Sequence, residues 1–174
     1  QNAKTKGREI REILGLSSTD LLERIEARIQ SIFRIEFNAV DKSFLDGGQA
    51  ELRPEEGCLY YDQDLNSDPD KKIWMLAHEL GHLEIHGARL FKHSNEPDPV
   101  YGSMYNLAGV NSLARYNKNS KEEVEANAFA LELLCPSDEV FRLWKEDSSI
   151  TAEKLARELG CPQIIVHTQL AEAL

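Results

Sequence analysis

Long apolar runs are missing from this sequence. No stretch of eighteen apolar residues occurs, so we expect no membrane-spanning helix. The opening segment, QNAKTKGREIREILG, lacks the apolar core of a secretory signal, so we expect no secretion. Internal repeats and low-complexity segments are also lacking. With 174 residues, 41% hydrophobic and 29% charged, the sequence has the composition of one globular domain with at most a small appendage.

Positive charge and cysteine are both scarce. The 20 Lys and Arg residues against 30 Asp and Glu give a net charge of −10. This balance opposes nonspecific binding to nucleic acid, which needs basic side chains to displace counterions from phosphates. The three cysteines, Cys58, Cys135 and Cys161, are odd in number and far apart, so we expect small buried thiols in a reducing cytoplasm rather than disulfides.

The two ends of the sequence suggest a piece of a longer protein. The chain begins with Gln rather than Met and stops inside an apolar helical pattern. We therefore expect it to be fused to, or associated with, further domains.

The first part of the sequence predicts one helix followed by short strands. Residues 17–33 form an amphipathic pattern with apolar residues on one stripe, and Ser17 with Asp20 resembles a capping box. Three short segments rich in β-branched and aromatic residues and separated by turn residues predict strands, at 34–40, 50–54 and 57–62.

The second part predicts helices. Asp68-Pro69 is a good helix start, and that helix is expected to continue to about His86, with Gly87 as its terminator. A connection at 87–118 lacks clear periodicity. Further helices are predicted from about residue 120 to Cys135-Pro136, at 137–144, and on both sides of a break at 160–162.

The motif His78-Glu79-x-x-His82 carries the chemistry. Four-residue spacing puts both imidazoles on one face of a helix, close enough to share one ion. Two neutral imidazoles hold Zn²⁺, the cation lowers the pKa of a water molecule, and Glu79 takes the proton. An exposed helix with His and Glu spaced for solubility is the competing interpretation. Neighbouring Leu76 and Leu80 predict burial and weaken it.

A catalytic zinc needs a third protein ligand. His86 lies one further turn along, but three ligands in a row on a straight helix cannot surround an ion tetrahedrally. Ala88 stands where metzincins have a third His. We therefore expect His86 to support a ligand or to lie at the helix end.

The following helix contains a better third ligand. Glu123 and Asn127 are four apart, so Glu123 can supply a carboxylate oxygen while Asn127 hydrogen-bonds a ligand histidine. Ser120-x-x-Glu123 is also a capping box, which would make Glu123 a helix-start residue only. Glu122 and Glu125 are rival ligands on other faces of the helix.

These residues carry a family resemblance. AHELGHLEIH, followed some forty residues later by EEVEANAFALELLCP, resembles the ImmA/IrrE family of metallopeptidases over roughly residues 15–174. The paired motifs are more specific than HExxH alone. The sequence departs from the family pattern in its long 87–118 connection and in Cys135, where the usual residue is Met.

The resemblance implies an α+β, zincin-like fold of the gluzincin kind. It implies a small curved sheet, an HExxH helix, a second ligand-bearing helix and a helix-turn-helix-like tail. Its expected metal ligands are His78, His82 and Glu123, with Glu79 as general base. We divide the chain into a metallopeptidase domain at 1–146 and a helical extension at 147–174. Similar proteins are cytoplasmic, and several cleave a helix-turn-helix repressor to switch on stress or mobile-element genes.

The other candidate groups are less decided. An oxyanion donor besides the metal is needed for peptide hydrolysis, and four residues of the long connection are candidates: His93, Tyr101, Tyr105 and Tyr116. Residues 58–62 are either an edge strand that aligns an extended substrate or an ordinary interior strand. The tail at 151–174 has two Lys or Arg against three Glu, which favours packing or partner contact over DNA binding.

The leading hypothesis is therefore an intracellular zinc-dependent endopeptidase that cleaves a regulatory protein. Mn²⁺ or another divalent ion could replace Zn²⁺, because imidazole and carboxylate ligands accept several metals. The alternatives are a non-catalytic metal-binding sensor or protein-interaction module of a larger protein, and a purely structural metal site. Glu79 favours the enzyme, since a binding module needs no general base.

Overall fold

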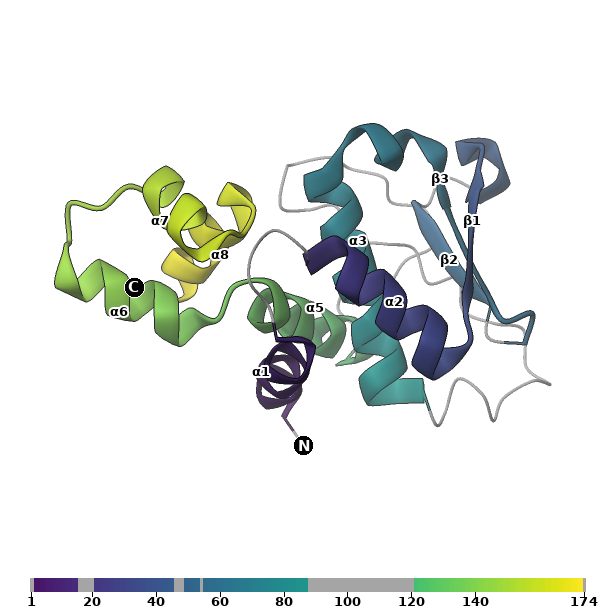
Figure 1. The fold of residues 1–174 in the computed structure, drawn as a ribbon, viewed down its shortest axis with the longest axis horizontal. Coiled ribbons are helices and arrows are strands. Elements are labelled where there is room, and N and C mark those ends of the chain that lie inside the picture. The colour runs from purple at the N-terminus through teal and green to yellow at the C-terminus, as the bar shows by residue number, and fades with distance from the viewer. Residues whose placement is uncertain (1, 16–20, 46–48, 54, 88–120, 174) are drawn as a thin grey trace.

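The computed structural model describes residues 2–15, 21–45, 49–53, 55–87 and 121–173. In these ranges the chain is a mostly helical α+β fold with a small three-stranded sheet (Figure 1). The helices and strands are α1 (Ala3–Leu14), α2 (Leu21–Phe33), β1 (Glu36–Val40), β2 (Ala50–Arg53), β3 (Cys58–Asp62), α3 (Pro69–Gly81), α5 (Lys121–Leu134), α6 (Ser137–Glu146), α7 (Ala152–Leu159) and α8 (Gln163–Ala173). Short helical turns are η1 (Lys42–Leu45), η2 (Gln63–Ser67) and the π-helical η3 (His82–His86).

The sheet is mixed, with β3 in its centre. β1 pairs with β3 in parallel and β2 pairs with it antiparallel, so that Leu59 lies between Phe37 and Leu52. The suggestion that residues 58–62 are an edge strand is therefore wrong, because both sides of β3 already have hydrogen-bonded neighbours. β1 begins at Glu36, two residues later than predicted, because Arg34 turns the chain with a left-handed φ of 56°.

Helix α1 was not predicted from the sequence. Asn2 caps it by accepting a hydrogen bond from the Lys4 amide, and Gly15 ends it in the left-handed conformation. Its buried face includes Gly7, where a Cβ atom would lie 2.5 Å from the backbone oxygen of Phe129. Glycine at this position is what lets α1 lie directly against α5.

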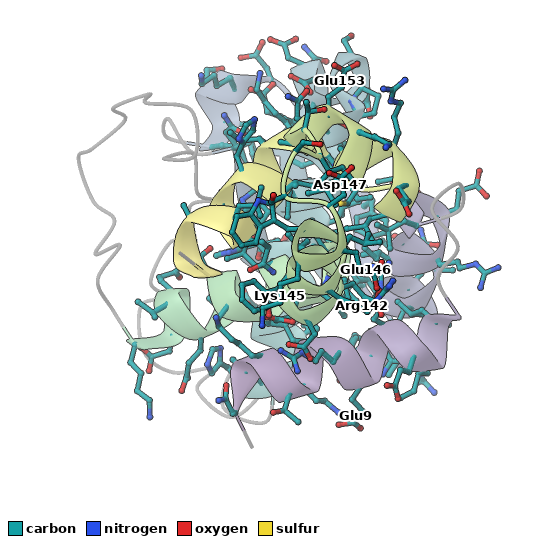
Figure 2. The ribbon with its side chains drawn as sticks, turned by 90° about the vertical axis from the view of Figure 1, so that its left-hand side faces the viewer. Glu9, Arg142, Lys145, Glu146, Asp147 and Glu153 are labelled. Atoms are coloured by element: carbon teal, nitrogen blue, oxygen red, sulfur yellow. The ribbon has the colours of Figure 1, made fainter. Side chains whose placement is uncertain are left out.

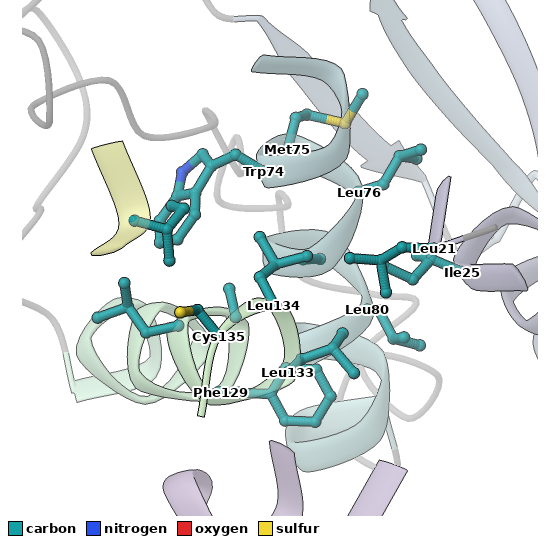
Figure 3. Packing of buried hydrophobic residues seen from close by; sticks show 14 of the residues in the cluster. Leu21, Ile25, Trp74, Met75, Leu76, Leu80, Phe129, Leu133, Leu134 and Cys135 are labelled. Atoms are coloured by element: carbon teal, nitrogen blue, oxygen red, sulfur yellow. The ribbon is translucent and has the colours of Figure 1, made fainter. Parts of the chain in front are cut away.

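The core lies between the sheet, α2, α3 and α5 (Figures 1 and 3). Leu76 and Leu80 of α3 face α2 on one side, and α5 crosses α3 on the other. At this crossing a Cβ atom on Gly81 would lie 3.1 Å from the Cα atom of Ala126 and 3.0 Å from the ring of Phe129. The close approach of the two helices brings side chains about forty residues apart in sequence to the same place.

The C-terminal helices form the end of the molecule opposite the sheet (Figure 1). α7 and α8 lie on either side of the predicted break at 160–162, and both pack with α6. Gln169 of α8 donates a hydrogen bond to the backbone oxygen of Cys135, at 2.6 Å, and so joins α8 to the end of α5. Whether α7 and α8 act as a helix-turn-helix, and whether 147–174 is a separate unit, stay predictions.

All three cysteines are free thiols. Cys135 and Cys161 are buried with their sulfur atoms 3.0 Å apart, as small core residues can be. The expectation of burial is wrong for Cys58, which is only half-buried because it begins β3 at the end of the sheet.

The predicted helices at 17–33, 69–86 and 120–134 are confirmed over the residues described, but Ser17, Asp20, Ala88 and Ser120 lie outside them. The turn η3 ends at His86, and Gly87 is its C-cap residue in a right-handed conformation, with φ −49°. None of the helices in the described ranges combines the length and apolar character that a membrane crossing requires.

Candidate metal centre

Helix α3 positions the histidine motif. Asp68 caps the helix by accepting a hydrogen bond from the Lys71 amide, and Pro69 occupies the first turn. Eight consecutive residues from Trp74 to Gly81 are buried, and His82 follows them with no exposed surface. The motif is therefore part of the core, and the interpretation of an exposed, solubilising helix is wrong.

Three side chains from α3, η3 and α5 converge on one point. The Nε2 atoms of His78 and His82 are 3.1 Å apart. One carboxylate oxygen of Glu123 lies 3.2 Å from the Nε2 of His78, and the other lies 3.2 Å from the Nε2 of His82. All three residues are buried, and this group could hold a metal ion.

These distances fit a divalent cation. For a tetrahedral zinc with bonds of about 2.0 to 2.1 Å, neighbouring ligand atoms are about 3.3 to 3.4 Å apart. The observed separations of 3.1 and 3.2 Å are close to that spacing. The donor set of two imidazoles and one carboxylate is also one that catalytic zinc accepts.

Asn127 orients His78. Its Oδ1 atom lies 2.9 Å from the Nδ1 atom of His78. An amide oxygen only accepts hydrogen bonds, so Nδ1 carries the proton and Nε2 keeps its lone pair for the shared point. The structure thus brings Asn127 to the place that the spacing from Glu123 predicted.

His86 contacts His82 at Nδ1, the ring nitrogen that does not face the other two converging residues. Its Nδ1 atom is 3.3 Å from the Nδ1 of His82, and its Nε2 atom is 3.1 Å from Oε2 of Glu125. The helix widens into the π-helical turn η3 at this point, which the sequence did not predict; such turns are frequent at functional sites. Glu125 therefore contacts His86 and is not one of the three converging groups.

Glu79 has an unusual environment. Its side chain has no exposed surface, and neither carboxylate oxygen has a hydrogen-bond partner among the described residues. Burial raises the pKa of Glu79 to about 8. Most buried polar atoms in proteins are hydrogen-bonded, so a partnerless carboxylate beside His78 indicates a group kept for a function.

The converging residues have shifted pKa values. Burial lowers the pKa of His82 to about 4, which favours the neutral imidazole that can bind a cation. Burial alone would lower the pKa of His78, but the hydrogen bond with Glu123 and the nearby carboxylates outweigh it and raise the pKa. Burial alone would raise the pKa of Glu123, but its bonds to both histidines outweigh burial and lower it.

The four candidate oxyanion donors, His93, Tyr101, Tyr105 and Tyr116, lie outside the described residues, so they stay predictions. Glu122 is half-buried and is not part of the converging group. Sequence reasoning missed the contact of Glu125 with His86. The position of Glu125, two residues after Glu123, did not indicate this contact, because the contact depends on where η3 lies relative to α5.

The described residues thus form a mostly helical α+β domain with a buried His-His-Glu group that could hold a metal ion. The IrrE N-terminal-like domain family, peptidase M78, matches residues 25–170, and the chain belongs to this family. The resemblance to ImmA/IrrE proteins is thereby confirmed, and it indicates a metallopeptidase-like domain.

A solved structure of a Mycobacterium tuberculosis transcriptional regulator has a similar fold. The two share 17% sequence identity with a TM-score of 0.61, and the match covers 97% of this chain and 46% of that one. At this identity the likeness concerns the fold alone. The chain spans less than half the length of that regulator, and no curated protein matches it.

Proposed function

We propose that this chain is a zinc-dependent endopeptidase with a zincin-like active site. His78, His82 and Glu123 hold the metal, and Glu79 is the general base. The single observation that supports this most is Glu79: a fully buried carboxylate without a hydrogen-bond partner among the described residues, directly beside a metal ligand. A metal site with only a structural role has no use for such a group.

In this mechanism Asn127 and Glu79 have separate roles. Asn127 holds His78 with its Nε2 lone pair toward the ion, at a hydrogen-bond distance of 2.9 Å. A divalent cation in this site would polarise the carbonyl of a peptide and make water more acidic. Without a metal, a pKa of about 8 leaves Glu79 mostly protonated at neutral pH. A cation in the site would lower this pKa, and the ionised carboxylate would then accept a proton from the attacking water and pass it to the leaving amine. Burial keeps bulk water away and strengthens these interactions.

The substrate we propose is a regulatory protein inside the cell, of the helix-turn-helix repressor type. The family resemblance supports this. We expect no direct contact with nucleic acid. The exposed surface formed by α6, the residue after it and the start of α7 lacks the basic stripe of a DNA-reading surface (Figure 2). It mixes acidic and basic side chains: Glu146, Asp147, Glu153, Arg142 and Lys145.

The second candidate function is a metal-binding sensor without catalysis, as part of a larger regulator. Its support is that the structural neighbour is a transcriptional regulator, of which this chain spans 46%. Both functions use the same three ligands, and only the enzyme needs Glu79. Replacing that residue therefore separates them.

The test has two measurements. Metal analysis of the 174-residue chain should find close to one zinc per chain. Cut sites in cells that express the native chain should then be compared with cells that express Glu79→Gln or the control Glu122→Gln. We expect Glu79→Gln to keep the metal and lose at least about a hundredfold in cleavage, with Glu122→Gln unchanged. Cleavage that survives Glu79→Gln rules out the enzyme, and a biological effect that survives with it favours the sensor.

A further inference from the structure

A continuous path of polar contacts leads from the protein surface to the candidate metal centre. It begins at Glu125 on α5, whose side chain is 32% exposed. Oε2 of Glu125 lies 3.1 Å from Nε2 of His86, and Nδ1 of His86 lies 3.3 Å from Nδ1 of His82. The path ends at Nε2 of His82, one of the three converging atoms.

The direction of these hydrogen bonds follows from what each atom can do. An ionised carboxylate only accepts hydrogen bonds, so Nε2 of His86 must carry a proton and donate the hydrogen bond to Glu125. In a neutral imidazole the other nitrogen is then an acceptor, so Nδ1 of His86 accepts from Nδ1–H of His82. His82 is left with its lone pair on Nε2. That is the tautomer needed to bind a cation.

The two ligand histidines are therefore held by different means. His78 donates directly to the neutral amide of Asn127, within the protein. His82 donates to a second histidine, which in turn depends on a carboxylate that reaches solvent. The partner of a ligand histidine orients its ring and makes it a better donor to the metal.

We propose that His86 and Glu125 are positioning residues for the metal ligand His82, and that this partly exposed carboxylate sets the affinity of the buried site. The proposal rests on the proposed function, because it assumes that a metal binds at His78, His82 and Glu123. It goes beyond it by assigning a role to Glu125, which is not one of the three converging residues.

The test measures zinc affinity of the 174-residue chain by competition with a chelator. Glu125→Ala removes the acceptor and should weaken zinc binding on the order of tenfold, as loss of such a partner does. Glu125→Gln keeps an oxygen that can accept from His86 and should weaken binding no more than about threefold. The control Glu122→Gln removes the same charge from the same helical turn and should bind zinc as the native chain does. The partial exposure of Glu125 makes these variants suitable, because the fold does not need it buried.

A second readout observes the protons themselves. Long-range ¹H–¹⁵N NMR spectra of the zinc-loaded chain should show His78 and His82 protonated at Nδ1 and His86 protonated at Nε2. A native His86 protonated at Nδ1 would overturn the proposal. In Glu125→Ala, the tautomer preference of His86 should be lost while that of His78 is kept.

The possible results distinguish a failure of the proposed function from a failure of the positioning role of Glu125 and His86. If the native chain binds no zinc, the proposed function fails, and this inference fails with it. If the native chain binds zinc and Glu125→Ala binds it equally well, only this inference fails. If Glu125→Gln weakens binding as much as Glu125→Ala, net charge rather than a hydrogen bond is responsible, and the positioning role is wrong.

Discussion

The buried carboxylates at the two ends of helix α5 have different surroundings. Near its C-terminal end, Glu132 has no exposed surface and is fully engaged: Arg8 donates to it at 2.8 Å, and the hydroxyl of Ser137 donates at 2.6 Å. Near the N-terminal end, Glu123 meets two histidines, and beside them Glu79 has no hydrogen-bond partner among the described residues. Most buried polar groups in proteins are hydrogen-bonded, and an exception among the described residues, Glu79 of α3, lies beside the N-terminal end of α5.

The contacts that hold α5 differ in the same way. Its C-terminal half lies against α1 at Gly7, where a Cβ atom would meet a backbone oxygen at 2.5 Å. Its N-terminal half meets α3 at Gly81, where a Cβ atom would lie 3.0 Å from the Phe129 ring and 3.1 Å from two backbone atoms of Ala126. The contact at Gly7 is therefore the tighter and more rigid of the two, because its closest backbone atom would lie at 2.5 Å.

The largest expected effect comes from breaking the rigid contact. Gly7→Ala should lower the free energy of unfolding by about 3 kcal/mol, because the backbone oxygen of Phe129 cannot move aside. Gly81→Ala is the matched control, since both glycines are helical and gain the same helix propensity. It should cost about 1 kcal/mol. Chemical denaturation measures both, and equal losses would show that the two contacts do not differ in rigidity.

The next largest effect on stability is expected at Glu132, the buried carboxylate that accepts hydrogen bonds from Arg8 and Ser137. Burial alone would raise the pKa of Glu132, but the hydrogen bonds from Arg8 and Ser137 outweigh it and hold the pKa below its usual range. The stability it contributes is therefore present above a pH of about 4.3, where the unfolded carboxyl is ionised, and is lost as pH falls through the lower folded pKa. Glu132→Gln should cost about 2 kcal/mol at neutral pH.

The pH dependence is the decisive part of that measurement. Denaturation of the native chain and of Glu132→Gln should be compared from neutral to acid pH. We expect the difference between them to shrink as the pH falls below about 4. A difference that stays constant or grows in acid would mean that the charge of Glu132 does not contribute as described.

A smaller effect is expected at the candidate metal centre, on zinc affinity rather than on the free energy of unfolding. Asn127→Leu removes the acceptor for Nδ1 of His78, so zinc affinity should fall about tenfold, equivalent to about 1.4 kcal/mol. Thermal unfolding of the metal-free chain should change little, because Asn127 is only half-buried. Loss of metal-free stability without loss of zinc affinity would assign Asn127 to the structure rather than to the site.

The smallest effect is expected at Val124, which lies in the sequence between Glu123 and Glu125. Val124 follows Glu123 directly but is 55% exposed. Val124→Ser should change both stability and zinc binding by less than about 0.5 kcal/mol, as surface substitutions usually do. A large change would show that this side chain is covered by something outside the described residues.

Much of the site could be predicted from local spacing. The four-residue interval between His78 and His82 was enough to place both rings on one face, and the same interval linked Glu123 with Asn127. The caps at Asp68 and the stop at Cys135-Pro136 are local chemistry too, and the helix bounds agree with them. These features depend on residues within one or two turns, so the sequence contains them directly.

The rest depended on contacts between distant segments. The central place of β3, the approach of α1 at Gly7 and the contact of Glu125 with His86 each join parts of the chain that local periodicity cannot relate. The π-helical turn at His82–His86 also departs from the regular spacing assumed for a helix. The choice between an edge strand and an interior strand for residues 58–62 was left open for this reason, because pairing on both sides of a strand is a tertiary property.

The chemistry available to this protein can be read from its sequence: two imidazoles and several carboxylates at helical spacing, with the caps and breaks that shape their helices. The sequence also named Glu123 as the expected third ligand. The contact of Glu125 with His86, and the burial of Glu79 without a partner among the described residues, become visible only in the folded chain. Both depend on burial and on neighbours across a helix crossing, where the close approach of Gly81 to Ala126 brings distant segments together.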